Sequence, residues 1–174
     1  LYDYRIVEKK QMTIESGRGP LTLDLDVKNG KMTLARVNML APILESSKIP
    51  TTLPGDPPIN APIEVDGKKF EVTCVSMGNP HAVIFLEEDP TDEWVLGLGP
   101  KIEKLPIFPR RTNVEFVHVL SNNEIRMRVW ERGSGETYAC GTGACGACEV
   151  RVRDTPLLAC TDGPAIDLKR VVFR

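Results

Sequence analysis

Alternating apolar and polar residues predict a chain built mainly of β-strands. Between Glu124 and Glu131, the apolar residues Ile125, Met127 and Val129 alternate with charged or aromatic ones, the period of a strand with two different faces. Similar patterns predict strands at Met12–Glu15, Leu21–Val27, Lys31–Asn38, Phe70–Ser76, Ala82–Leu86 and Asn113–Leu120.

Short turn signals separate several of these strands. Asn29-Gly30 lies between two alternating runs, and Asn-Gly at such a place favours a tight hairpin turn. Asp66-Gly67 and Gly17-Arg18-Gly19-Pro20 mark further turns, and Gly78-Asn79-Pro80 interrupts the strand pattern. Leu21–Val27 and Lys31–Asn38 are therefore expected to pair as a hairpin.

Two stretches depart from this alternation. Residues 41–63 contain six prolines and few periodic apolar residues, so they are expected to form a connecting loop outside the core. In Asp92–Leu105, the residues Trp94, Leu98 and Ile102 recur at helical spacing and predict a helix. Two glycines and a proline inside that stretch weaken its helical tendency.

The chain changes character again between Gly133 and Cys148, where glycine and then other small residues dominate. Small side chains at every position from Gly141 to Cys148 suit a helix that is packed closely on all sides. Because Pro156 follows soon afterwards, this helix is expected to be short.

Composition narrows the class of protein. The 174 residues carry 22 Lys and Arg against 24 Asp and Glu, so no basic excess points to nucleic acid. No apolar run approaches the ~20 residues that a membrane-spanning helix needs. Five cysteines, an odd number with three of them inside nine residues, indicate a reduced intracellular protein. A globular protein without nucleic-acid or membrane partners is expected.

The cysteine spacing allows two interpretations. Cys140-x4-Cys145-x2-Cys148, with Cys160 further on, has the start of a [2Fe–2S] spacing and would also suit a four-thiolate zinc site. Against a cluster, Cys160 follows in an unpaired-looking segment beside Pro156. Alternatively, Cys145 and Cys148 are small apolar residues of a crowded helix.

Cys140 stands where the glycine-rich turn meets the expected helix start. Unsatisfied N–H groups and the positive end of the helix dipole would favour its thiolate and lower its pKa. The N–H groups of Gly141, Thr142 and Gly143 would also suit an anion such as a carboxylate. A thiolate beside a bound carboxylate can remove a neighbouring proton. The competing interpretation is a buried structural cysteine in a turn.

Other polar residues have a structural interpretation beside a functional one, and for Asn79 the structural role in a turn is the commoner. Asn79 is suited to shaping a turn, and His81 begins a strand. Glu131 and Arg132 end a strand beside the Cys140 turn, where a surface ion pair competes with a role in a site. His118 is expected to be an ordinary strand residue.

Three motifs occur in one order along the chain: Met77–His81, Thr112–Val117, and Glu131–Ala144 with the pattern Glu-Arg-Gly-x-Gly-Glu-Thr-x-Ala-Cys-Gly-Thr-Gly-Ala. Together they closely resemble the second half of the diaminopimelate epimerase family. A looser resemblance covers residues 1–39. Most of the first 150 residues are therefore included.

The resemblance implies an α/β (α+β) fold of two pseudo-symmetric lobes, each with mixed or antiparallel strands around a central helix. It implies an isomerase that interconverts LL- and meso-diaminopimelate, a lysine and peptidoglycan precursor. Neither a cofactor nor a metal is expected. Two thiols, one on each side of the substrate α-carbon, would remove and return the proton.

The resemblance also implies individual roles. Cys140 would be one of the two acid/base thiols, with His81 and Glu131 as a supporting pair near the chemistry. Gly141 and Thr142 would bind the reacting carboxylate through backbone N–H groups. The distal end of the substrate would be held by Asn79, Asn113 and Arg132. Cys145 falls at a small-residue helix position of the family pattern, which disfavours the iron–sulfur interpretation.

The sequence also departs from the family. The Cys-Gly-Asn-Gly motif of the first lobe is absent, and Leu1–Tyr4 resembles the end of the helix that follows it. The expected division is therefore a remnant of the N-terminal lobe (1–36), the C-terminal lobe (37–160) and a returning strand (161–174). The N-terminal lobe would be largely missing.

This departure leaves alternatives to an active epimerase. The chain would then be a truncated or diverged non-catalytic lobe, or a related racemase with another substrate. The resemblance implies a small-molecule substrate and leaves open a homodimer. The expected location is the cytoplasm, or the plastid in a plant.

Overall fold

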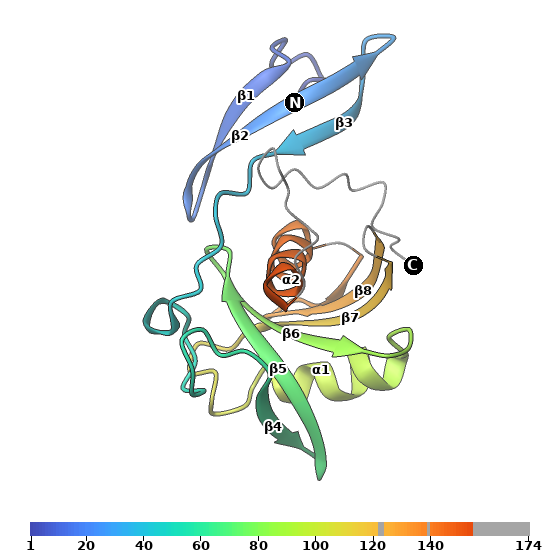
Figure 1. The fold of residues 1–174 in the computed structure, drawn as a ribbon. Helices are drawn as coiled ribbons and strands as arrows, with labels where there is room; N and C mark the ends of the chain where they lie inside the picture. Colours follow the sequence, from blue (N-terminus) through green and yellow to red (C-terminus); the bar gives the residue numbers. More distant parts are fainter. Residues whose placement is uncertain (122–123, 139, 155–174) are drawn as a thin grey trace.

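The computed structural model describes residues 1–121, 124–138 and 140–154 as two β-sheets with helices against the larger one (Figure 1). β1 (Gln11–Ser16), β2 (Gly19–Lys28) and β3 (Lys31–Val37) form an antiparallel three-stranded sheet. Asn29 and Gly30 between β2 and β3 both have positive φ, at 52° and 73°. The hairpin predicted around Asn-Gly is thus confirmed.

The larger sheet has six strands in sequential order. They are β4 (Ala61–Val65), β5 (Lys68–Ser76), β6 (Pro80–Leu86), β7 (Asn113–Ser121), β8 (Glu124–Glu131) and β9 (Gly135–Thr137). Only β6 and β7 pair in parallel among these neighbours. A parallel pair needs a crossover, which η2 (Glu93–Leu98) and α1 (Gly99–Ile102) supply.

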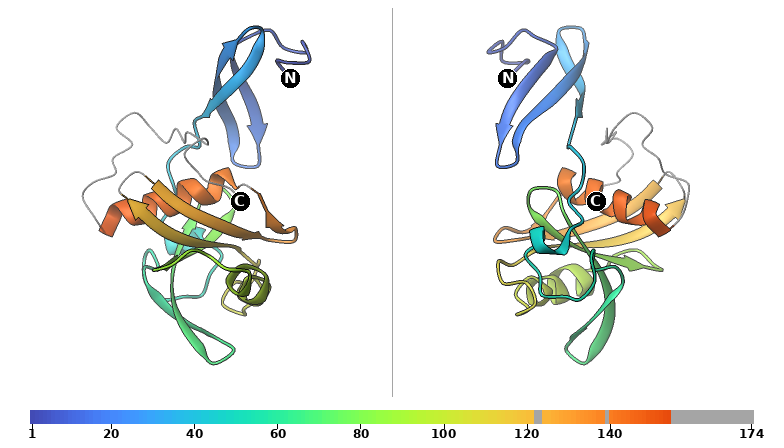
Figure 2. Two further views of the ribbon diagram at one scale, coloured as in Figure 1. Left: turned by 90° about the vertical axis from the view of Figure 1, so that its right-hand side faces the viewer. Right: turned by 60° about the vertical axis from the view of Figure 1, so that its left-hand side comes forward.

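Helices cover the two faces of this sheet differently. α2 (Gly141–Asp154) lies on the face turned toward the three-stranded sheet, whereas η2 and α1 lie on the other (Figures 1 and 2). Strands around a helix in a mixed α/β arrangement confirm the expected fold class. Within the described residues, no helix is long and apolar enough to cross a bilayer.

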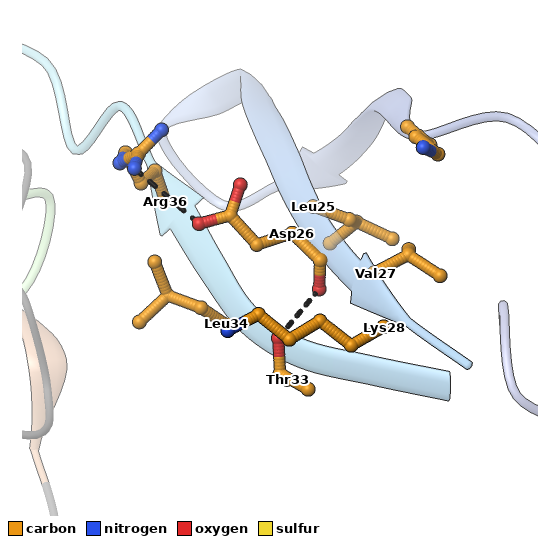
Figure 3. Close-up of a pocket in the computed structure, with 8 residues that line it drawn as sticks. Leu25, Asp26, Val27, Lys28, Thr33, Leu34 and Arg36 are labelled. Atoms are coloured by element: carbon orange, nitrogen blue, oxygen red, sulfur yellow. Dashed lines mark hydrogen bonds and ion pairs between the residues drawn. The ribbon is translucent and has the colours of Figure 1, made fainter. Parts of the chain in front are cut away.

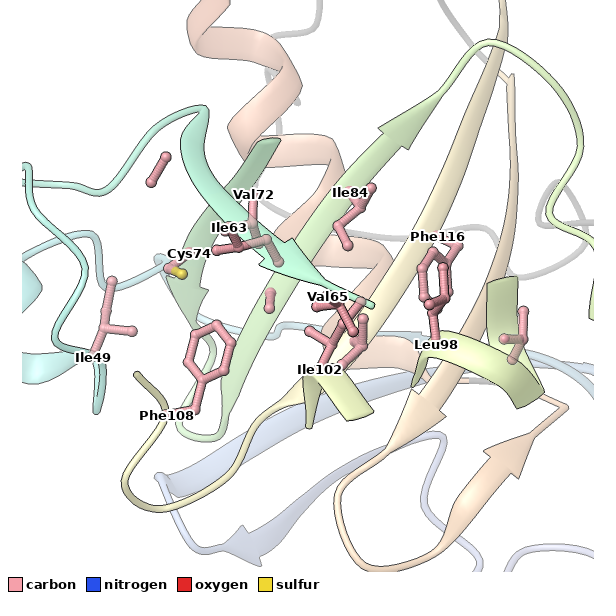
Figure 4. Close-up of a cluster of buried hydrophobic side chains, with 14 residues drawn as sticks. Ile49, Ile63, Val65, Val72, Cys74, Ile84, Leu98, Ile102, Phe108 and Phe116 are labelled. Atoms are coloured by element: carbon pink, nitrogen blue, oxygen red, sulfur yellow. The ribbon is translucent and has the colours of Figure 1, made fainter. Parts of the chain in front are cut away.

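Strand alternation divides the core into two clusters. On β7, Val114 and Phe116 join a large cluster on the α1 face, and Val117 joins a smaller one with Ala144 and Ala147 of α2. Figure 4 shows the large cluster, in which Phe116 and Leu98 lie beside Ile102 and Val65. The larger apolar side chains of the sheet therefore gather on the side away from α2.

The loop prediction for residues 41–63 was wrong in part. Its last residues form β4, and a short 3-10 helix, η1 (Ser46–Lys48), interrupts it. Ile49, Ala61 and Ile63 are buried in the large cluster. These apolar residues are too widely spaced to show a period, so only tertiary contacts reveal them as core.

Three other expectations need adjustment. The helix predicted at Asp92–Leu105 consists of η2 and α1, and it ends at Ile102. The three-residue strand β9 lies inside the glycine-rich stretch that predicted a turn. α2 continues to Asp154 and is longer than expected. The expected returning strand at 161–174 lies outside the described residues, and the three-part division stays a prediction.

Candidate active site

Cys140 occupies the N-cap of α2. Its carbonyl accepts the first helical hydrogen bond, from the Ala144 N–H at 3.0 Å. Its sulfur accepts a bond from the Gly143 N–H at 3.3 Å, the place where Ser, Thr or Asp oxygens usually cap a helix. Thr142 Oγ1 lies 3.4 Å from the same sulfur. The thiol is therefore fixed at the amino end of the helix by two neighbouring groups.

The pKa of the Cys140 thiol differs from the one expected from the sequence. Burial, and then the negative charge of Glu115, raise the pKa of Cys140 to about 11 from its usual 9.0. Hydrogen bonds from Thr142 and Gly143 lower that pKa, by less than burial raises it. The prediction of a lowered pKa was wrong because the helix end is buried, and desolvation disfavours the thiolate.

A chain of hydrogen bonds runs from this helix end into the sheet. Asn79 Nδ2 donates to Thr142 Oγ1 at 3.3 Å, and Asn79 Oδ1 lies 3.0 Å from His81 Nε2. His81 Nδ1 lies 2.6 Å from Glu115 Oε1. The side chains of His81 and Glu115 have no exposed surface at all. Asn79, His81, Thr142 and Cys140, four of the predicted site residues, are thus brought together.

Asn113 and Arg132 form a second group. Asn113 is buried, its Oδ1 accepts the Arg132 backbone N–H at 2.9 Å, and its Nδ2 donates to the Pro80 carbonyl at 3.1 Å. The exposed Arg132 donates from Nη1 to the Arg110 carbonyl at 3.0 Å. Asn113 therefore fixes the backbone of Arg132 at the end of β8.

Glu131 and His81, expected to act as a pair, each bond to another residue. Its Oε1 accepts a 2.5 Å hydrogen bond from Thr137 Oγ1, whereas His81 bonds to Glu115. Glu131 still contributes to raising the pKa of Cys140 through its charge. Gly141 is partly buried, and the space where a Cβ would project from it is open.

A cavity of about 230 Å³ lies beside Asn79 and Thr142. It is also lined by Met77, Gly78 and Met39, and by Ser16, Gly17, Arg18 and Leu21 of the three-stranded sheet. Arg18 donates to the carbonyls of Met39 and Ala41. The tip of the first hairpin is thereby held over the site.

A larger cavity of about 570 Å³ lies on the three-stranded sheet itself, between β2 and β3 (Figure 3). Its lining includes Leu25, Asp26, Thr33, Leu34 and Arg36, and Asp26 pairs with Arg36 at 3.3 Å. None of the predicted site residues lines it. Of the predicted site residues, Asn79 and Thr142 line the smaller cavity.

The contacts of the site bear on whether its residues could bind a metal ion or an iron–sulfur cluster. His81, Glu115 and Cys140 place one potential ligand atom each within 4.8 Å of one another. Both ring nitrogens of His81 are, however, already hydrogen-bonded, to Glu115 and Asn79. Of the cysteines in the proposed iron–sulfur spacing, the side chain of Cys148 and all of Cys160 lie outside the described residues.

Sequence reasoning missed Glu115 and Arg18 as parts of this site. Glu115 lies within the motif Thr112–Val117, but the resemblance implied no role for it. A signal was present, because a carboxylate stands among apolar residues in the run Val114-Glu115-Phe116-Val117. Arg18 gave no such signal, since its position over the site depends on how the hairpin docks. His118 pairs with Asp89 at 2.8 Å, away from the site.

Comparison with known proteins identifies relatives of the chain. A family model described as diaminopimelate epimerase matches residues 73–162. The diaminopimelate epimerase of Desulfitobacterium hafniense is 49% identical over 145 residues, covering 83% of this chain and 51% of that protein. That of Moorella thermoacetica is 49% identical over 147 residues, covering 84% and 52%. The chain spans about half the length of the curated relatives it matches.

Solved structures show the same fold at low sequence identity. A probable proline racemase from Agrobacterium radiobacter K84, with bound carbonate, superposes with a TM-score of 0.67 at 14% identity. The match covers 93% of this chain and 51% of that one. A hydroxyproline epimerase from Agrobacterium vitis gives 0.65 at 13% identity, covering 91% and 50%. At these identities the likeness concerns the fold alone.

Proposed function

Because the chain belongs to the diaminopimelate epimerase family, we propose that it forms one half of a cofactor-independent site interconverting LL- and meso-diaminopimelate. The reaction inverts an α-carbon, so one group removes the α-proton and another returns a proton from the opposite face. The observation that carries the proposal is Cys140 at the N-cap of α2, where its sulfur lies beside backbone N–H groups.

The helix end suits the charge that develops in this reaction. Removing the α-proton places negative charge on the adjacent carboxylate, and preorganised N–H donors stabilise such charge best. Gly141 and Thr142 are the first residues of α2, and their N–H groups lie at its positive end. Cys140 would protonate the carbanion in one direction and remove the proton in the other.

Residues of the second group would hold the far end of the substrate. Arg132 is exposed, and its planar guanidinium suits a carboxylate because it can bind two oxygens. Asn113 bonds to the Arg132 backbone and would therefore act largely by placing this arginine. Asn79 borders the cavity and would contact substrate from the other side.

The opposing acid/base group would come from the part of the family's length that this chain does not span. Two groups on opposite faces explain inversion, because acid and base are both in place before the reaction starts. The proposed substrate is a small molecule on the lysine and peptidoglycan route. The proposed location is the cytoplasm.

Proton exchange in deuterated water tests the proposal. The chain is fused to the half of the Desulfitobacterium hafniense relative that it does not span, and the α-hydrogen of diaminopimelate is followed by proton NMR. We expect the fused protein to remove this signal. Cys140→Ala should slow the exchange about 10²–10⁴-fold, the usual contribution of an acid/base group.

Cys145→Ala is the matched control, since it removes a buried thiol from the same helix. This variant should retain exchange. Equal losses in both variants would contradict the role of Cys140. A folded fused protein that leaves diaminopimelate unchanged would contradict the proposed reaction.

A further inference from the structure

Glu115 is an unusual residue of this site because its two carboxylate oxygens differ in their hydrogen bonding within the described part of the chain. Oε1 is bonded to His81, whereas Oε2 is buried without a hydrogen-bond partner in the described part of the chain. Burying a carboxylate oxygen without a partner is costly, and such a group calls for an explanation. Its neighbours along β7, Val114 and Phe116, are buried apolar residues.

The first turn of α2 packs directly on this carboxylate. A Cβ added at Gly143 would come within 2.6 Å of Glu115 Oε1. Gly143 also donates its N–H to the Cys140 sulfur. The carboxylate therefore lies under the amino end of the helix, where the dipole stabilises negative charge, and close to the thiol.

From His81 to Cys140, the hydrogen bonds share one direction. Two acceptor oxygens, Oε1 of Glu115 and Oδ1 of Asn79, face the two ring nitrogens of His81, so both N–H groups donate, and Asn79 Nδ2 then donates to Thr142 Oγ1. Since Thr142 Oγ1 accepts this bond, its own proton is available to the Cys140 sulfur at 3.4 Å. Glu115 thus holds His81 in place at the start of a chain of donors that points toward the thiol.

We propose that Glu115 is a positioning residue that keeps Cys140 protonated at rest while holding His81, Asn79 and Thr142 as donors toward its sulfur. The inference rests on the proposed function, in which Cys140 supplies a proton to the substrate carbon. Among the described residues, the charged and titratable groups that face Cys140 are Glu115 from β7, His81 from β6 and Glu131 from the end of β8. Of the two carboxylates, Glu115 raises the pKa of Cys140 more.

Alkylation of the thiol tests this role without any turnover. Iodoacetamide labelling of the chain is measured from pH 7.5 to 10.5, and the modified cysteine is located by peptide fragmentation. Glu115→Gln should shift the Cys140 profile about one pH unit lower. Because a more acidic thiol is also a weaker nucleophile, the rate at fixed pH should rise only about threefold.

Two matched variants separate charge from packing. Glu115→Asp keeps the charge and should label as slowly as the wild type. Glu103→Gln removes another buried carboxylate, one bonded to Trp130 and Gly133, and should leave the Cys140 profile unchanged. An unshifted profile in Glu115→Gln, or an equal shift in Glu115→Asp, would overturn the proposal.

A measurement on the unaltered chain covers the case in which Glu115→Gln does not fold. Nitrogen NMR of ring-labelled histidine at pH 7 should show a proton on Nε2 of His81. An unprotonated Nε2 would reverse the chain of donors and overturn the inference. Neither result depends on diaminopimelate, so failure here is distinguishable from failure of the proposed reaction.

Discussion

The two faces of the six-stranded sheet are built for different purposes from the same strands. On β7, Phe116 points into the α1-side cluster, and its neighbour Glu115 points toward α2. On β6, Ile84 lies in the large cluster, whereas His81 carries the hydrogen bonds of the site. One face is filled by large apolar side chains, and the other buries titratable groups beneath a helix of small residues.

The difference shows how the fold combines stability with chemistry. Large side chains on the α1 face exclude water and supply most of the apolar burial of the described core. Small residues on α2 let its backbone approach the sheet, so that its first N–H groups and Cys140 meet Glu115 and His81. Each face can be altered separately to test this division.

The largest expected loss of stability comes from a substitution on the apolar face of the sheet, which packs against α1. Phe116→Ala removes a fully buried ring that contacts Trp94, with ring centroids 5.9 Å apart. The variant should lower the free energy of unfolding by about 3–5 kcal/mol because it leaves a cavity. Urea denaturation measures this loss.

Val117→Ala is the counterpart on the α2 face of the same strand. Deleting its two methyl groups should cost about 2 kcal/mol. A loss in Val117→Ala as large as that in Phe116→Ala would contradict the unequal contributions of the two faces.

A substitution that disturbs the close approach of α2 to β7 should cause a loss of stability of intermediate size. Gly143→Ala places a methyl group 2.6 Å from Glu115 Oε1, and should destabilise the chain by about 1–3 kcal/mol through overpacking. Alanine ordinarily favours a helix over glycine by about 1 kcal/mol, so the sign of the change is informative.

Gly141→Ala serves as the control for stability, since no described residue lies within 4 Å of a Cβ there. This variant should be neutral or slightly stabilising in thermal denaturation. If both alanine variants behave alike, the close packing of α2 on Glu115 is not the reason for glycine at position 143.

The last expected effect is a loss of stability that appears only at alkaline pH. The pKa of Cys140 is about 11 in the folded chain, above its usual 9.0, so the folded state holds the proton more tightly. Stability from this group is complete below pH 9 and is lost as pH rises toward 11. Between pH 8 and 10.5 the loss should be about 2 kcal/mol.

Comparing the slopes of stability against pH isolates this contribution. Cys140→Ala should flatten the curve between pH 9 and 10.5 relative to the wild type, whatever it does to stability at pH 7. Cys74→Ala should flatten it as well, because burial raises the pKa of Cys74 to about 12 on the other face. An unchanged slope in Cys140→Ala would contradict the raised pKa.

Local sequence patterns were sufficient to predict much of the fold. The strands with clear alternation, such as β8, were predicted, as was the hairpin at Asn29-Gly30. The position of Cys140 at the start of α2 also followed from the glycine-rich turn before it. Local pattern failed for residues 41–63, where Ile49 and Ile63 enter the core through contacts distant in sequence.

The sequence by itself determined the family, the strand pattern and the residues that bear chemistry, because alternation, turn dipeptides and motifs are local properties. Only the tertiary structure decided that His81 meets Glu115 and that the Cys140 thiol has a raised pKa. Both depend on which strands lie under the first turn of α2. Desolvation and charge act through space, so a helix end that favours a thiolate in isolation becomes one that favours a thiol when it is buried against a carboxylate.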